Sequence, residues 1–311
     1  MKKLKIYLLT YLKGMAMGAA DIVPGVSGGS IALITGIYQR LLDSINAFTG
    51  DNLKLLLKFE LKGFYKSVNG SFLLSLLLGI MTSIFTLSKL ITWLMDEHPI
   101  PLWSFFCGLI LISAFIILKE IKRWHLGVII SLLIGTALAW WVTGLPPTTS
   151  PDALWFTFAA GAIAICAMIL PGISGSFILL ILGKYETVLA AVSEKDILTL
   201  GIFASGCMVG LLSFSRVVSW LLRKFYSTTI GLLSGFMLGS INKLWPWKVV
   251  TQYRTSSSGE EKPFLTENIW PSEYLAQVGA EPNLTWAIFG FVGGIVLVLG
   301  IDLLAAYLKK S

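Results

Sequence analysis

Two short glycine- and serine-rich motifs hold the residues of this chain best suited to chemistry. The motif Pro24-Gly25-Val26-Ser27-Gly28-Gly29 recurs as Pro171-Gly172-Ile173-Ser174-Gly175-Ser176, and each copy interrupts an apolar stretch. The Pro-Gly turn should end one half-helix, and the residues after it should begin the next. Free N–H groups and serine hydroxyls at a helix N-terminus bind anions, phosphate above all. The alternative is that the small residues only let helices pack closely.

The duplication of the motif favours the anion interpretation. The residues expected to contact the anion are Ser27, Gly28, Gly29, Ser30, Ser174, Gly175 and Ser176, and the expected hairpin turns are Pro24, Gly25, Pro171 and Gly172. Non-helical backbone at membrane depth is tolerated only where protein or a water-filled cavity surrounds it, so both breaks indicate a site.

Three charged residues lie inside apolar segments. Asp21 stands three residues before Pro24, and Met168 is its counterpart in the second copy. A membrane-embedded carboxylate is costly unless it is paired or functional, so Asp21 is either a proton or cation coupling site or a structural partner of Lys13 or a backbone N–H. Lys89 and Arg216 each either attract an anionic headgroup from one membrane face or extend to the nearer interface.

The composition identifies an integral membrane protein. Of the 311 residues, 55% are hydrophobic and 13% are charged, and the mean hydropathy is +0.79. A soluble domain has about 25% charged residues. The formal net charge of +7 does not indicate nucleic acid, because the basic residues lie at segment ends. Neither the three cysteines nor any motif suggests a metal or another cofactor, and we expect none.

The apolar segments predict six membrane crossings and two re-entrant hairpins. The expected crossings are 72–95, 101–118, 126–142, 197–222, 229–244 and 286–308. The arms after the two Pro-Gly turns are too short to finish a crossing. With the N-terminus in the cytoplasm, most lysines and arginines fall on the cytoplasmic side, so both termini are expected there.

The chain is internally duplicated beyond the two motifs. Gly79 and Gly108 match Gly206 and Gly235, and the Ser-Lys pair at Lys89 matches the Ser-Arg pair at Arg216. The predicted repeats are 1–142 and 143–311. The first contains a cytoplasmic amphipathic helix near 51–68, carrying Lys54, Lys58, Lys62 and Lys66, and the second contains an outside loop near 243–284. Three crossings per half invert the second repeat, which gives an all-α fold of two inverted repeats, an architecture typical of secondary transporters.

The residues also carry a family resemblance. The run from Lys13 to Ser30, KGMAMGAADIVPGVSGGS, resembles the signature of the bacterial polyprenyl-phosphate transporters, and the second motif matches as well. The resemblance implies a protein of the bacterial cytoplasmic (inner) membrane that returns undecaprenyl phosphate from the outer to the inner leaflet for envelope synthesis. It implies a polyprenyl-phosphate lipid as partner and roles for Asp21, Ser27 and Ser174. A proton or a sodium ion could be coupled.

Two other functions are alternatives to transport of a lipid phosphate. Undecaprenyl-pyrophosphate phosphatases have a Pro-Gly-x-Ser-Arg-Ser element, but here Gly28 and Gly175 occupy the arginine position. The apolar segments also hold no cluster of glutamate or histidine for metal-assisted hydrolysis. An enzyme is therefore disfavoured. A secondary transporter of small anions is the third candidate.

Overall fold

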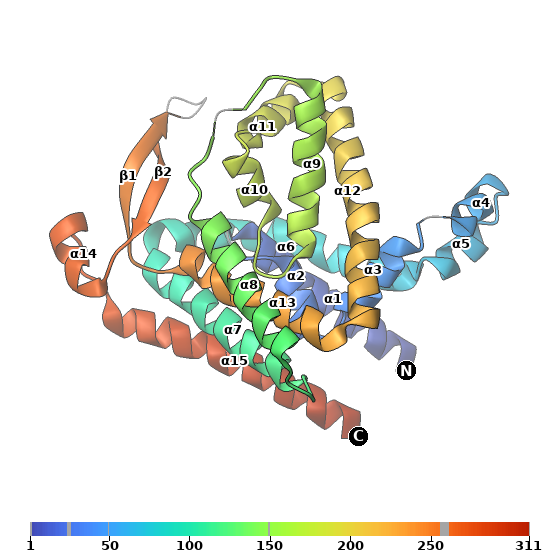
Figure 1. The fold of residues 1–311 in the computed structure, drawn as a ribbon, viewed down its shortest axis with the longest axis horizontal. Coiled ribbons are helices and arrows are strands. Elements are labelled where there is room, and N and C mark those ends of the chain that lie inside the picture. The colour runs from blue at the N-terminus through green and yellow to red at the C-terminus, as the bar shows by residue number, and fades with distance from the viewer. Residues whose placement is uncertain (1, 24–25, 49, 149, 256–260, 311) are drawn as a thin grey trace.

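The computed structural model describes residues 2–23, 26–48, 50–148, 150–255 and 261–310. Pro24 and Gly25, the expected first hairpin turn, lie outside the described residues. Within the described ranges the fold is helical apart from one antiparallel β-hairpin (Figure 1). This agrees with the all-α class expected from the sequence, and the β-hairpin is an addition to it.

The elements of the first half end shortly before residue 150. They are α1 (Lys2–Ile22), α2 (Gly28–Ile34), α3 (Tyr38–Asn46), α4 (Asp51–Leu57), α5 (Leu61–Ser67), α6 (Gly70–Glu97), α7 (Pro99–Lys119) and α8 (Leu126–Thr143). The second half repeats this order with α9 (Leu154–Ile169), α10 (Gly175–Ile181), α11 (Tyr185–Ser193), α12 (Ile197–Lys224), α13 (Tyr226–Leu244), β1 (Lys248–Thr255), β2 (Glu261–Asn268), α14 (Pro271–Val278) and α15 (Leu284–Lys310).

The helix pairs of the two halves correspond. Helix α1 packs on α6 as α9 packs on α12, and α7 packs on α15 as α13 packs on α8. Glycines mark these contacts: a Cβ on Gly79 would lie 2.1 Å from the Tyr11 carbonyl oxygen, and one on Gly206 would lie 2.0 Å from that of Phe158. Tyr11 and Phe158 are themselves matched by the motif alignment. The close contacts therefore support the duplication, while the inversion of the second half stays a prediction.

The short helix after each break also ends in the same way. Gly36 and Gly183 take positive φ angles of 69° and 66°. The turn is closed by Ile37 N donating to the Ala32 carbonyl and by Lys184 N donating to the Leu179 carbonyl, each at 2.9 Å. A glycine in this conformation ends a helix without strain. Beyond it the chain turns sharply, with α10 and α11 bent by 106°.

Five described helices are long and apolar enough to cross a membrane, namely α6, α7, α8, α12 and residues 284–301 of α15. The first four contain a crossing expected from the sequence, and the span 284–301 overlaps the expected crossing 286–308. The sixth, 229–244, falls in α13, which does not meet this length and apolarity criterion in the described chain. Helix α13 packs against both α7 and α8 and is largely buried. Its serines and glycines thus face protein.

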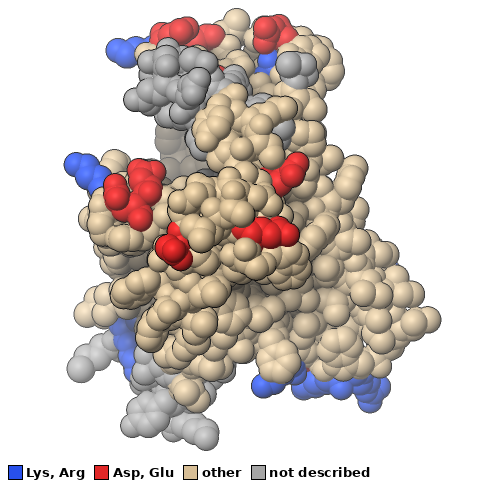
Figure 2. Space-filling view, turned by 90° about the vertical axis from the view of Figure 1, so that its left-hand side faces the viewer, with Lys and Arg blue, Asp and Glu red and all other residues tan. Residues whose placement is uncertain are grey.

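Charged side chains are unevenly distributed on the face seen in Figure 2. A group of lysines and arginines lies along the lower edge, toward which both termini point in Figure 1, whereas the acidic side chains lie at the top and middle with a few basic side chains beside them. A broad surface of other residues separates them. Many large apolar side chains are exposed on the candidate spans, as expected for helices that face lipid.

The amphipathic helix expected near 51–68 is two short helices. Helix α4 ends at Leu57, and α5 begins at Leu61. Phe59 takes a positive φ of 55°, and Glu60 N donates to the Leu55 carbonyl at 2.9 Å, which is the hydrogen bond of a helix-terminating turn. The lysines spaced by four therefore do not form one continuous stripe.

The outside loop expected near 243–284 is partly ordered as strands and a helix. Strands β1 and β2 pair in antiparallel register, for example Lys248 with Asn268. Two tryptophans fasten this segment: the indole of Trp245 donates to the Ile269 carbonyl at 2.9 Å, and that of Trp247 donates to the Pro282 carbonyl at 2.8 Å.

Candidate functional site

The first break places a carboxylate at the start of α2. Ser27 has extended backbone angles, and its hydroxyl accepts from the N–H of Gly29 at 3.1 Å. The carboxylate of Asp21 accepts from the N–H of Gly28 at 2.7 Å. A Cβ on Gly28 would lie 2.6 Å from that carboxylate, so only glycine allows Asp21 this position. The protein's own anion therefore lies where the sequence predicts a bound anion.

Hydrogen bonds join the two breaks to each other. The hydroxyl of Ser27 donates to the carbonyl oxygen of Met168 at 3.2 Å, and the hydroxyl of Ser30 accepts from the N–H of Gly172 at 2.8 Å. The phenol of Tyr38 donates to the carbonyl oxygen of Ile169 at 3.0 Å. These side chains of the first half are buried. Backbone groups left unpaired where α9 ends are thus satisfied by side chains from the other half.

The second break is built differently. Gly172 has a φ of 88°, and a Cβ there would lie 2.8 Å from the Phe236 carbonyl oxygen. The hydroxyls of Ser174 and Ser176 are 2.8 Å apart. Ser176 is exposed, whereas its counterpart Gly29 is buried against the Ile169 carbonyl. Gly175 is buried, and a Cβ there would lie 2.8 Å from the Ala164 carbonyl oxygen.

Lys89 and Arg216 lie apart from this junction. Lys89 is exposed on α6 and Arg216 is exposed on α12. Within the described part of the chain, neither forms a hydrogen bond or an ion pair. Lys13, the alternative partner for Asp21, donates to the Thr35 carbonyl at 2.6 Å. The roles predicted for Lys89 and Arg216 remain predictions.

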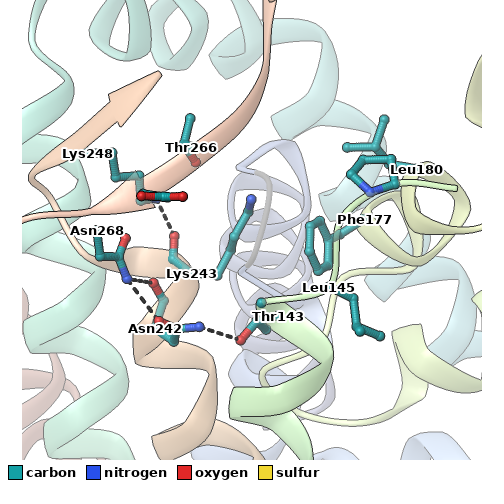
Figure 3. A pocket seen from close by; sticks show the side chains of 12 residues that line it. Thr143, Leu145, Phe177, Leu180, Asn242, Lys243, Lys248, Thr266 and Asn268 are labelled. Carbon is teal, nitrogen blue, oxygen red and sulfur yellow. Dashed lines mark hydrogen bonds between the residues drawn. The ribbon is translucent and has the colours of Figure 1, made fainter. Parts of the chain in front are cut away.

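A cavity of about 360 Å³ lies beside the second break (Figure 3). It is lined by the end of α8 and the loop after it, by α10, by the end of α13 and by both β-strands: Thr143, Gly144, Leu145, Pro147, Phe177, Leu180, Asn242, Lys243, Lys248, Thr266, Glu267 and Asn268. Lys243 and Lys248 are not among the site residues expected from the sequence. The available signal was a pair of lysines enclosing Leu244-Trp245-Pro246-Trp247, where an apolar helix ends.

The described residues contain no group of three or more histidine, cysteine, aspartate or glutamate side chains that could hold a metal ion. The three cysteines are free; for example, the thiol of Cys107 donates to the Leu244 carbonyl at 3.1 Å.

The five described apolar helices that are long enough to cross a membrane, together with a broken helix in each half, identify a multi-pass membrane protein. The chain belongs to the VCA0040-like family, described as undecaprenyl phosphate translocase-like, whose model matches residues 17–262.

Two curated relatives cover most of the chain. A polyprenyl-phosphate transporter of Vibrio cholerae serotype O1 is 48% identical over 296 residues, which is 95% of this chain and 96% of the relative. A polyprenyl-phosphate transporter of Staphylococcus aureus is 32% identical over 262 residues, which is 76% of this chain and 86% of the relative. No solved structure is significantly similar to the chain.

Proposed function

We propose that this chain moves undecaprenyl phosphate, a polyprenyl phosphate, across the bacterial cytoplasmic membrane from the outer to the inner leaflet. The lipid would then be reused in envelope synthesis. The family description and the names of both relatives support this substrate. The direction rests on the resemblance noted in the sequence.

The junction between the two breaks is the observation that carries the proposal. Ser27 and Ser30 of the first half bond directly to the backbone of Met168 and Gly172 in the second. Two discontinuous helices that meet between repeats are how many secondary transporters build a site open to one face at a time. Parting the halves would break these bonds and open the junction, which is the movement that alternating access requires.

The motif residues would receive the phosphate when the junction opens. Gly28, Gly29 and Ser30 supply N–H and hydroxyl groups at the start of α2, and Ser174, Gly175 and Ser176 supply them at the start of α10. The carboxylate of Asp21 accepts from the first of these N–H groups, that of Gly28. Phosphate and carboxylate repel each other where water screens poorly, so Asp21 must bind a proton or a cation, or move away. Binding of a proton or a cation by Asp21 would couple the lipid to an ion.

The chain would lie with both termini in the cytoplasm. The lysines and arginines at the lower edge of Figure 2 support this, because cytoplasmic loops carry an excess of basic residues. The loops between α6 and α7, α8 and α9, and α13 and α15 would then face outward. Lys89 would attract the headgroup at the outer side and Arg216 at the inner side.

A transport assay tests the function directly. Purified protein is reconstituted in vesicles that contain a polyprenyl phosphate, and an external phosphatase reports how much of the lipid is exposed outside. Protein-containing vesicles should exchange the lipid between leaflets at least tenfold faster than empty vesicles. Equal rates would refute the function. Release of phosphate by the protein itself, with or without divalent metal, would indicate an enzyme instead.

A further inference from the structure

The lysine-lined cavity beside α10 holds two ammonium groups with few oxygen partners. The ammonium of Lys243 lies 4.5 Å from the centre of the Phe177 ring and donates no hydrogen bond to any described residue. Lys248 donates to the Lys243 carbonyl at 2.6 Å, and its ammonium lies 4.5 Å from the centre of the Trp103 ring. An aromatic ring attracts a cation electrostatically. It does not replace the oxygen atoms that normally accept hydrogen bonds from the N–H groups of an ammonium.

Among the residues that the structure describes, no carboxylate forms an ion pair with either lysine. The ion pairs among the described residues join Lys54 with Asp51, Lys184 with Asp152 and Arg223 with Asp43. Glu267 also lines the cavity, but it is exposed and lies beyond ion-pair distance of both ammonium groups. Both lysines are partly buried, and two like charges that interact in such a site are unfavourable unless an anion joins them.

The neighbouring polar side chains of Asn268, Asn242 and Thr143 are hydrogen-bonded to each other. The amide of Asn268 donates to the side-chain oxygen of Asn242 at 2.8 Å, and the amide of Asn242 donates to the hydroxyl of Thr143 at 3.2 Å (Figure 3). This network fixes the end of α13 and leaves the ammonium groups of Lys243 and Lys248 and the hydroxyl of Thr266 among the donors that line the cavity.

The walls of the cavity differ in polarity. Leu145, Phe177 and Leu180 line it on the side of α10, while Lys248 and Asn268 approach from the β-hairpin (Figure 3). Phe177 directly follows Ser176, so the apolar wall begins where the second motif ends. A ligand with a phosphate group and an apolar chain would satisfy both sides.

We propose that this cavity is a binding site for the phosphate group of a lipid, held by the ammonium groups of Lys243 and Lys248 before the lipid enters the junction. The inference rests on the proposed function and gives it a second, separate site. The cavity is enclosed by the loops after α8 and α13, which the proposed topology turns outward, so its lipid would come from the outer leaflet. Burial and the nearby charge of Lys243 lower the pKa of Lys248 to about 7, which agrees with an ammonium lacking its counter-ion.

Binding measurements on the purified full-length protein test the site. The probes are farnesyl phosphate, farnesol and inorganic phosphate, titrated into wild type, Lys243→Gln and Lys248→Gln. Each variant should raise the Kd of farnesyl phosphate at least tenfold, because a charge-assisted hydrogen bond is lost. The Kd of farnesol should stay within twofold. Lys243→Arg should keep most of the affinity, because it keeps the charge.

Lys195→Gln is the matched control, because Lys195 is an exposed lysine in the loop before α12 and loses the same charge. It should bind farnesyl phosphate as wild type does, and thermal unfolding should show that all variants are folded. Wild-type affinity in both Lys243→Gln and Lys248→Gln would overturn the site. Inorganic phosphate that binds as tightly as farnesyl phosphate, with the same lysine dependence, would overturn its assignment to a lipid.

The transport assay separates this inference from the proposed function. Wild-type protein that moves the lipid, together with lysine variants that bind and move it equally well, would refute the site and leave the function intact. Wild-type protein that binds farnesyl phosphate through the two lysines but does not exchange lipid between leaflets would refute the function and leave the site intact.

Discussion

The carboxylate of Asp21 has the geometry of a helix cap, and it occupies the position in which it would compete with a bound phosphate for the N–H of Gly28. It accepts from the N–H of Gly28 at 2.7 Å, where a phosphate oxygen would otherwise lie. Capping a helix with a carboxylate is common and stabilising, so the bond alone does not imply a role in transport. Its place at the junction, three residues before the break, makes its charge relevant to the ligand.

Asp21→Asn should separate the cap from the charge. The asparagine side chain can still accept from the Gly28 N–H, so folding should be preserved. Lipid phosphate should still bind, whereas the dependence of transport on pH or on a sodium gradient should disappear. Asp196→Asn is the control, because Asp196 caps α12 at the surface through Leu198 and Thr199. Unchanged ion dependence in Asp21→Asn would make the carboxylate purely structural.

Phosphate binding beside Lys248 should take up protons above neutral pH. With a pKa of about 7 the free amine is mostly neutral at pH 8, and a bound phosphate would favour its charged form. Lys243, Glu267 and the thiol of Cys107 are its titratable neighbours. Phosphate itself is already a dianion at pH 8, because its second pKa is about 6.

Calorimetry of farnesyl phosphate binding in buffers of different ionisation enthalpy measures this uptake. Most of one proton should be taken up at pH 8, and much less at pH 6. Lys248→Arg should abolish the uptake, since arginine stays charged at both pH values. Proton uptake that is identical in Lys248→Arg would show that another group titrates.

At the scale of helices, close packing of backbones holds each half together. Gly79 on α6 and Gly206 on α12 stand against carbonyl oxygens of α1 and α9. A methyl group at either position would force the helices apart, because a carbonyl oxygen on a helix cannot rotate away as a side chain can. The packing of apolar helices in a membrane depends on such contacts.

Gly79→Ala and Gly206→Ala should each destabilise the protein by about 1–3 kcal/mol through overpacking. Gly201→Ala is the control on α12, because no atom lies within 4 Å of the added Cβ. That variant should be neutral or up to about 1 kcal/mol more stable, since alanine favours helix. Unfolding in detergent measures all three. Equal stability of the three variants would contradict the packing described here.

The sequence anticipated the helices and both breaks, but not the cavity. Hydropathy located five of the spans, and the duplicated motif located the breaks, because both signals are local in the chain. The bond between Ser30 and Gly172 and the meeting of Thr143 with Asn242 join distant segments, so no local pattern reports them. In the sequence, Lys243 and Lys248 are indistinguishable from ordinary basic residues of a loop. Only the fold shows that Lys243 lies against Phe177 and Lys248 against Trp103.

For the molecule as a whole, the central prediction is the opposite orientation of its two halves. The loop before α6 and the loop before α12 correspond in the repeat, so inversion should place them on opposite faces of the membrane. Lys58 is exposed in the turn between α4 and α5, the two short helices that precede α6, and Lys195 is exposed in the loop before α12. In a background without the three native cysteines, Lys195→Cys should react with an impermeant maleimide added outside intact cells. Lys58→Cys should react only after the membrane is opened. Labelling of both from one side would rule out inverted repeats.

The hydrogen bonds across the junction make it energetically costly for the two halves to separate when no ligand is bound. If the halves part while the site is empty, the carbonyls of Met168 and Ile169 lose the hydroxyls of Ser27 and Tyr38. Leaving a buried polar group unpaired costs about 1–3 kcal/mol, and here several would lose their partners at once. The unloaded protein should therefore rest closed. Its opening should be rare unless water, an ion or the ligand itself replaces those partners, which limits futile cycling without cargo.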